Sequence, residues 1–551
     1  MRSGQRVAVI AGTCAAVVSV LGFGAYSLLG GDTEDGERGN VAATSDDEPG
    51  EGVESGPPSA EEVLRTSGAF LDAWAAGDAA AAAELTDDPE AATAALTSLV
   101  EDAAVSQLTV TPQAPSGERV GFAVDAVVAY EEDEAVDPAE WSYSSELTVT
   151  RDADTGEPVV DWEPSVLHPD LADGQSIVTG PLDELPPVEV LDATGAVLTA
   201  EEHPTLAPIL EDLRERYAEE SGGSAGAETR IVDAEGETVA QLLALAEPSA
   251  GQVPTTIDPT IQAAAEAAVA GKSNASVVAI QPSTGAIQGI ANSPADGFNT
   301  ALEGSYAPGS TFKIVTASLL IDEGLASANA PHPCPQYFEV GGWRFQNLDE
   351  FEIEGGTFAD SFAASCNTAF ISQAPELSDD ALGNQARDAF GLGMTWQVGT
   401  TTMDGSVPTQ SDAQMAASLI GQGGVRMNPM TMASVSATVR NGGFLQPYLV
   451  PQSFDDREFA TASGLSAGTA QELRGLMNRT ATNGTAAEAM AGLGGDIGAK
   501  TGSAEVDGQD KPNAWFTAYR NDLAVAAVVP NSGHGGSNAG PVVADVLRAA
   551  P

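Results

Sequence analysis

The sequence predicts a multidomain α+β protein, and three patterns along its 551 residues support this fold class. An uncharged apolar run near the N-terminus is long enough for a single transmembrane helix. Residues 59–172 change from a helical pattern to a series of strands, as in a small α+β domain. Beyond residue 255, strand patterns stand at both ends of a largely helical segment. This arrangement predicts an antiparallel sheet flanked by helices.

The apolar run extends from Val7 to Leu29, about 23 residues or roughly 34 Å of helix, against a hydrocarbon core of about 30 Å. Two arginines precede it, and acidic residues dominate the segment that follows. We therefore expect residues 1–30 to be a cytoplasmic tail and a single-pass anchor in the cell membrane, with the rest of the chain extracellular. A cleaved signal peptide is the alternative, because Ala25-Tyr26-Ser27 resembles a cleavage site.

Composition narrows the classes of partner and cofactor. The net charge of −58 argues against binding to nucleic acid or to anionic lipid headgroups through general electrostatics. The three cysteines and four histidines show no metal-binding spacing, so we expect neither a metal nor a cofactor. With 42% hydrophobic residues, the chain is able to bury substantial cores.

Residues 31–58 are rich in Gly, Asp, Glu, Ser and Pro, and this composition predicts a disordered acidic linker. In residues 59–172, one helical face carries apolar side chains from Val63 to Trp74, and alanine-rich helical stretches follow. Strands are expected after these helices, enriched in β-branched and aromatic residues: 107–111, 120–130, 141–150 and 159–162.

Residues 173–255 give a weaker signal. Two proline and glycine pairs, Pro186-Pro187 and Gly222-Gly223, accompany one charged helix around Leu210 to Glu219. This pattern predicts a loosely built connecting module, with a dimerisation-like role as one interpretation.

Residues 256–551 begin with a predicted helix at Pro259 to Ala270. The helical middle of this segment, from Phe312 to about Met477, is bracketed by predicted strands, and a closing helix is expected at Val542 to Ala549. The five expected strands of the antiparallel sheet are 276–281, 286–291, 497–501, 514–519 and 523–529.

Lysine is rare in this chain, with four residues, and two of the four stand in serine-containing motifs: Ser310-Thr-Phe-Lys313 and Lys500-Thr-Gly-Ser503. A lysine three residues after a serine on a helix shares its face, and a desolvated amine is able to act as a base where arginine is not. Pro308-Gly309 precedes an apolar helical run, so Ser310 is expected at a helix N-terminus, which favours a developing anion.

A third motif, Ser365-Cys366-Asn367, lies between the other two. The order and spacing of S-x-x-K, S-x-N and K-T-G resemble the penicillin-binding protein family and its serine β-lactamase relatives. The resemblance covers about residues 255–551. Other stretches that carry it are Thr255–Pro259, Ser276–Ile280, Tyr306–Lys313, Ser365–Phe370, Asn441–Gly443, Lys500–Glu505 and Ala514–Phe516.

The resemblance implies a role for each motif residue. Ser310 would be the acylated nucleophile and Lys313 the base that takes its proton. Ser365 would relay a proton to the leaving amine. Lowering a lysine pKa by three units costs about 4 kcal/mol, and Lys500 is the neighbouring cation that would supply part of the shift.

The remaining residues would bind substrate. Asn367 would hold a backbone amide, and Lys500 and Thr501, with Ser503, would bind a terminal carboxylate. Gly502 would allow close approach of a ligand. The N–H groups of Ser310 and Ser503 would form the oxyanion hole.

The family reaction is acyl transfer on peptides that end in D-Ala-D-Ala, and β-lactams mimic that terminus and trap the acyl-enzyme. The resemblance thus implies a serine D,D-transpeptidase that acts on peptidoglycan stem peptides made available by a separate membrane glycan polymerase. Residues 59–172, ending in Trp162–Asp170, resemble the NTF2-like N-terminal domain of class B penicillin-binding proteins of the methicillin-resistance type.

Several alternatives stay open. A β-lactamase or D,D-carboxypeptidase of the same fold would share the three motifs, and so would a non-catalytic β-lactam sensor or scaffold. Cys334 and Cys366 lie on the same side of the expected anchor, and either a disulfide or a free thiol at Cys366 fits the sequence.

Overall fold

The computed structural model describes residues 56–130, 136–182 and 184–550. The expected membrane anchor and most of the acidic linker lie outside these residues. Within the described stretches, every helix is too short or too polar to cross a bilayer.

Three helices open the N-terminal domain: α1 (Ala60–Ala75), α2 (Ala79–Ala83) and α3 (Pro89–Glu101). Ser59 caps α1 in a capping box with Glu62, and the buried face of the helix is the apolar face that the sequence predicts. A sheet in the order β1-β2-β3-β4 follows, formed by β1 (Val105–Pro112), β2 (Arg119–Val128), β3 (Ala139–Arg151) and β4 (Pro158–Asp161). Trp74 meets Phe122 of β2 edge-on, so the helices cover the sheet through large apolar side chains.

The connecting module is more regular than the sequence predicts. Its charged helix is present as α4 (Ala207–Arg216), slightly earlier than expected. Strands that the sequence analysis does not place are a three-stranded sheet of β5 (Ser176–Pro181), β7 (Ala227–Val232) and β8 (Thr238–Ala246), and a parallel pair of β6 (Glu189–Leu191) and β9 (Gln252–Pro254). Register shifts interrupt the β7–β8 pairing, which explains why β8 lacks a clean alternation of apolar residues.

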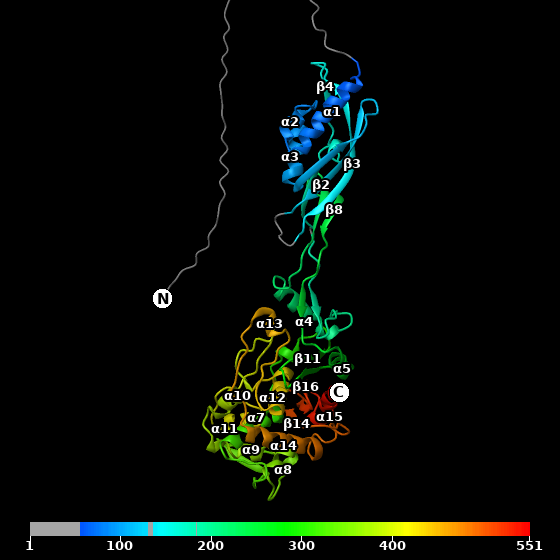
Figure 1. Cartoon of the computed structure of the whole chain (residues 1–551). Helices are drawn as coiled ribbons and strands as arrows, with labels where there is room; N and C mark the ends of the chain where they lie inside the picture. The colour runs from blue at the N-terminus through cyan, green and yellow to red at the C-terminus, as the bar shows by residue number, and fades with distance from the viewer. Residues whose placement is uncertain (1–55, 131–135, 183, 551) are drawn as a thin grey trace, which may run out of the picture. The chain divides into compact units, whose positions relative to one another are not determined.

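A five-stranded sheet forms the centre of the C-terminal domain, in the order β11-β10-β16-β15-β14. All neighbouring pairs are antiparallel, as the sequence predicts. The strands are β10 (Ala275–Ile280), β11 (Ile287–Ser293), β14 (Ile497–Ala504), β15 (Asn513–Arg520) and β16 (Leu523–Val529). Figure 1 labels three of these strands: β11, coloured green, and β14 and β16, which come from the orange-to-red end of the chain.

Both faces of this sheet are buried. Val277 of β10 lies in a core with α5 (Pro259–Val269) and α16 (Gly540–Ala549), whereas its neighbour Val278 lies in a second core. That second core contains α7 (Lys313–Asp322), α12 (Pro429–Asn441) and most of the apolar face of α14 (Ala467–Asn483). Adjacent side chains of β10 therefore pack against helices on opposite faces of the sheet, as the pleat of a strand requires.

Shorter elements complete the domain. They are α6 (Thr300–Glu303), η3 (Gly309–Phe312), η4 (Leu348–Glu350), α8 (Phe358–Ala363), α9 (Thr368–Ile371), η5 (Ala374–Glu376), α10 (Ala381–Phe390), α11 (Asp412–Ser418), α13 (Gln452–Asp455) and α15 (Gly535–Asn538). The helical middle also contains a hairpin that the sequence analysis does not place, β12 (Tyr337–Val340) and β13 (Trp343–Gln346). This hairpin leads directly into the candidate site.

Candidate active site

Ser310 is the second residue of the 3-10 turn η3, which continues directly into helix α7. Its position just before the helix agrees with the sequence prediction. Ser310 is partly exposed, while Lys313, three residues later, is fully buried at 0% exposure. The Ser310 hydroxyl thus belongs to a partly exposed residue, whereas the lysine three positions later is buried.

The amine of Lys313 binds the second motif. Its Nζ donates to the backbone oxygen of Ser365 at 2.8 Å and to Oδ1 of Asn367 at 2.7 Å. Burial lowers the pKa of Lys313 well below its ordinary value, and the positive charge of Lys500 lowers this pKa further. A neutral amine has two N–H groups, so two acceptor oxygens use both and leave the nitrogen lone pair free.

Lys500 lies on the edge strand β14 and is also fully buried. Its Nζ donates to the hydroxyl of Ser365 at 2.9 Å and to the backbone oxygen of Thr501 at 3.1 Å. Burial lowers the pKa of Lys500 to about 7. The structure therefore brings all three motifs together, with Ser365 between the two amines.

Aromatic rings line the same region. The Nζ of Lys313 lies 5.4 Å from the ring centre of Phe370, and that of Lys500 lies 5.6 Å from the ring centre of Phe362. The rings are part of the apolar surroundings of the two amines, and burial lowers both pKa values, with the charge of Lys500 adding to the shift of Lys313.

Strand β14 lies against the turn that carries Ser310. A Cβ atom on Gly502 would be 2.8 Å from the backbone oxygen of Pro308, and one on Gly309 would be 2.9 Å from that of Ser503. Glycine is required at both positions because the two backbones approach so closely. The Pro308 backbone is thus a close neighbour of Gly502, and the expected approach of a ligand to Gly502 stays a prediction.

The hydroxyl groups of the third motif have partners within the domain. Thr501 and Thr485 share a hydrogen bond of 2.6 Å between their hydroxyls. The backbone N–H of Gly535 donates to the Ser503 hydroxyl at 3.4 Å. Thr485 follows α14 and belongs to no motif, so sequence reasoning misses it.

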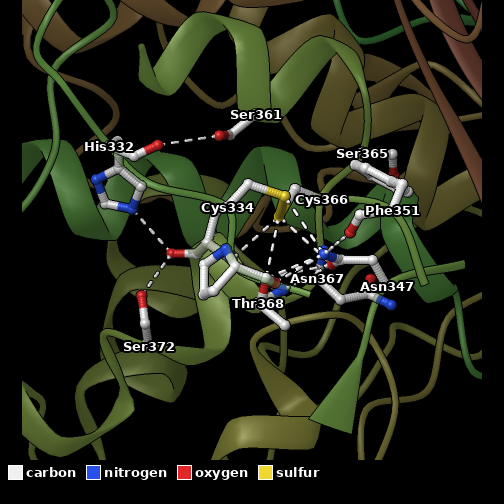
Figure 2. Close-up of a disulfide and its surroundings, with 12 residues drawn as sticks. His332, Cys334, Asn347, Phe351, Ser361, Ser365, Cys366, Asn367, Thr368 and Ser372 are labelled. Carbon is white, nitrogen blue, oxygen red and sulfur yellow. Dashed lines mark hydrogen bonds between the residues drawn. A yellow bond between two sulfur atoms is a disulfide. The ribbon is translucent and has the colours of Figure 1, made fainter. Parts of the chain in front are cut away.

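The two cysteines of this domain form a disulfide, Cys334–Cys366, which decides between the alternatives that the sequence leaves open. Cys366 stands between Ser365 and Asn367, so the bond is attached to the second motif itself. Figure 2 shows the side chain of Asn347 beside this disulfide, with hydrogen bonds to the residues around it. No signal in the sequence identifies Asn347.

The fold and the assembled motifs define the class of protein, and comparison with known proteins agrees. Residues 275–548 match the family described as the penicillin binding protein transpeptidase domain. Residues 62–175 match the NTF2-like N-terminal transpeptidase domain. This chain belongs to the family of penicillin-binding transpeptidases, which confirms the resemblance of both its domains.

Particular relatives are similar over most of their length. The peptidoglycan D,D-transpeptidase PbpA of Mycobacterium tuberculosis (strain ATCC 25618 / H37Rv) is 30% identical over 382 residues, covering 57% of this chain and 75% of the relative. PbpA of Mycolicibacterium smegmatis is 30% identical over 384 residues, with the same coverage. The crystal structure of Pseudomonas aeruginosa PBP2 in complex with WCK 5153 shares the fold, with a TM-score of 0.53 and 22% identity over 66% of this chain and 96% of that one.

Proposed function

We propose that this protein is a serine D,D-transpeptidase that cross-links peptidoglycan stem peptides through an acyl-enzyme on Ser310. β-Lactams inhibit it by acylating the same hydroxyl. The observation that carries this proposal is the convergence of two buried amines on Ser365, next to the turn that holds Ser310.

Acylation begins at the lone pair of Lys313, which stays available while its two N–H groups donate to Ser365 and Asn367. The neutral amine takes the proton of the Ser310 hydroxyl while Oγ attacks the carbonyl carbon of the penultimate D-Ala. The C–N bond to the terminal D-Ala then breaks. Ser365 accepts a hydrogen bond from Lys500, so its own proton is free to pass to the leaving nitrogen. Lys313 then passes the proton that it took from Ser310 to the Ser365 hydroxyl, which replaces the proton that Ser365 gave to the leaving nitrogen.

Deacylation reverses these proton movements. An acceptor amine from a neighbouring stem peptide attacks the ester carbonyl, and its proton passes to the neutral Lys313. The bond between Oγ and the carbonyl carbon breaks, the new amide forms, and Ser310 recovers its proton. The net change is the exchange of one amide for another, without hydrolysis.

The substrate is held by the edge of the sheet. Thr501 and Ser503 bind the terminal carboxylate, with Lys500 supplying positive potential from below, and Asn367 binds a substrate amide. The N–H groups of Ser310 and Ser503 form the oxyanion hole. Support comes from the close packing of Gly309 against the Ser503 backbone, which brings the two segments that carry these N–H groups side by side.

Labelling with a fluorescent penicillin tests the nucleophile. We expect stoichiometric labelling of the wild-type protein and none of Ser310→Ala. Ser305→Ala is the matched control, because this exposed serine lies five residues away and outside the motifs. Labelling of Ser310→Ala at the wild-type level would remove the assignment.

The lifetime of the label separates the transpeptidase from a β-lactamase. We expect the penicilloyl-enzyme to persist for minutes to hours, because a transpeptidase is deacylated by an attacking amine and only slowly by water. Turnover faster than about one per second, within the usual range of enzymes, would indicate a β-lactamase.

We further propose that residues 7–29 anchor the protein in the cell membrane with residues 31–551 outside. The support is the uncharged apolar run, preceded by arginines and followed by acidic residues. Protease added to spheroplasts should degrade the catalytic domain, whereas intact cells, whose envelope excludes the protease, should protect it. Protection of this domain in spheroplasts would contradict the topology.

We also propose that a separate polymerase supplies the glycan strands, because the upstream match is to an NTF2-like domain.

A further inference from the structure

Asn347 lies between the β12–β13 hairpin and the second motif, and its side chain is buried at 1% exposure. Its Oδ1 accepts hydrogen bonds from the backbone N–H groups of Asn367 at 2.8 Å and Thr368 at 3.1 Å. Its Nδ2 donates to the backbone oxygens of Phe351 at 2.8 Å and Pro335 at 3.0 Å. Two backbone N–H donors thus face Oδ1 and two backbone oxygens face Nδ2, and this pattern fixes the orientation of the Asn347 amide.

The disulfide joins the same two segments. Cys334 precedes Pro335, which accepts from Asn347, and Cys366 precedes Asn367, which donates to Asn347. Figure 2 shows the amide and the disulfide lying together between these segments. One covalent bond and one fully used amide therefore hold residues 365–368 against residues 334–351.

Ser365 needs such support because its backbone is in the left-handed region, with φ of 60°. This conformation is costly for a residue with a Cβ atom, and it persists where neighbouring structure imposes it. In this conformation Ser365 offers its backbone oxygen to Lys313 and its hydroxyl to Lys500. A relaxed backbone at Ser365 would move both acceptors away from the amines.

We propose that Asn347 is a positioning residue for acylation, which acts with the Cys334–Cys366 disulfide to hold Ser365 and Asn367 in register with the two lysines. The inference deepens the proposed function, since it assigns the support of the same site. Asn347 itself contacts neither Ser310 nor either lysine among the hydrogen bonds of the described residues. Its effect therefore passes through the backbone of residues 365–368.

Replacement of Asn347 by leucine tests the inference, because leucine has a similar volume and makes none of the hydrogen bonds of the amide. We expect the acylation rate constant with a fluorescent penicillin to fall about 10²-fold, the scale of a misplacement of about 1 Å. The final extent of labelling of the folded protein should stay near one equivalent. A merely structural role would instead reduce the extent of labelling and leave the rate constant of the folded fraction unchanged.

Asn428→Leu is the matched control. Asn428 is also a buried asparagine, with Oδ1 accepting from the N–H of Thr431 and Nδ2 donating to the oxygens of Leu302 and Met403. It caps α12 and does not touch residues 365–368. We expect this variant to lose thermal stability while its folded fraction is acylated at the wild-type rate.

Two further variants keep the inference testable if Asn347→Leu does not fold. Asn347→Asp retains the acceptor for the two N–H groups and should recover part of the rate. The double variant Cys334→Ala, Cys366→Ala should also be acylated more slowly than wild type. A wild-type rate constant in Asn347→Leu, or in both other variants, would overturn the inference. Failure of Ser310→Ala to abolish labelling would instead overturn the proposed function.

Discussion

Lys500 and Ser365 are joined by a hydrogen bond of 2.9 Å between amine and hydroxyl, across 135 residues of chain. The backbone oxygen of the same serine binds Lys313, so one residue contacts both buried amines. Two buried amines that both contact one serine cannot both be protonated at low cost. The site therefore favours a neutral Lys313 at physiological pH, whereas Lys500 titrates near pH 7, and the chemistry of the site should follow the titration of this pair.

The pH dependence of acylation is the first consequence. Burial brings the pKa of Lys500 to about 7, and burial with the charge of Lys500 lowers the pKa of Lys313 as well. We expect the second-order rate constant for penicillin acylation to rise as the pH increases from about 6 to about 8 and then to level off. The apparent pKa belongs to the pair of amines. A rate that is flat or falls over this range, while circular dichroism shows a folded protein, would contradict the base assignment.

Lys313→Arg should abolish acylation almost as completely as Ser310→Ala. Arginine stays protonated near neutral pH, so it has no lone pair with which to accept the Ser310 proton. General-base catalysis contributes about 10²–10⁴-fold, and we expect a loss at the upper end of this range. The penicillin acylation rate is the measurement, with thermal unfolding as the check on folding. Acylation within about tenfold of wild type would exclude Lys313 as the base.

Lys500→Met should stabilise the protein near neutral pH while it abolishes acylation. The amine has a pKa of about 7 in the folded protein and about 10.5 in the unfolded chain, so unfolding takes up a proton between these values. Stability from this group is therefore lost as the pH falls towards 7. At about 1.36 kcal/mol per unit the penalty reaches at most about 5 kcal/mol, less the hydrogen bonds that methionine forfeits.

Urea unfolding at two pH values measures this effect. The gain in free energy of unfolding for Lys500→Met should be large at about pH 6.5 and small at about pH 9.5. A gain that increases with pH would show that the amine is not held neutral by burial.

Gly502→Ala should loosen the contact between β14 and the turn that carries Ser310. The new Cβ would lie 2.8 Å from the Pro308 oxygen and 3.0 Å from the Cβ of Trp515, both of which are held by surrounding structure. We expect a loss of about 1–3 kcal/mol in the free energy of unfolding, together with slower acylation. Urea unfolding and penicillin labelling report the two effects.

Gly475→Ala is the control for this substitution. Gly475 lies on α14, and beyond its own helix no heavy atom would lie within 4 Å of an added methyl group. Alanine there should be neutral or stabilising by about 0.5–1 kcal/mol. Equal losses in the free energy of unfolding for Gly502→Ala and Gly475→Ala would contradict the explanation that close backbone approach requires glycine at position 502.

Sequence reasoning places the three motifs and the sheet because both depend on local patterns. Ser310 and Lys313 are neighbours on one turn, and the strands at both ends of the C-terminal domain have buried, apolar sequences. The order of the motifs then identifies the family. Local patterning is sufficient for these features.

The rest depends on contacts between distant segments. The disulfide requires Cys334 and Cys366 to meet across a sequence separation of 32, and the composition of the intervening chain does not fix that meeting. Asn347 is recognisable only from the distant residues that its side chain contacts. The strands of the connecting module are short or shifted in register, so they lack the alternation on which a strand prediction rests.

The order of strands in the central sheet has a consequence for biosynthesis. Strand β16 pairs with β10 on one side and with β15 on the other, and β15 alone pairs with the strand of Lys500. During synthesis, Ser310 is therefore made long before β14 is able to join the sheet, because β14 pairs only with β15 and β15 joins the rest of the sheet through β16. Acylation by a β-lactam should therefore require the chain through Val529, so polypeptides truncated before β16 should not be acylated.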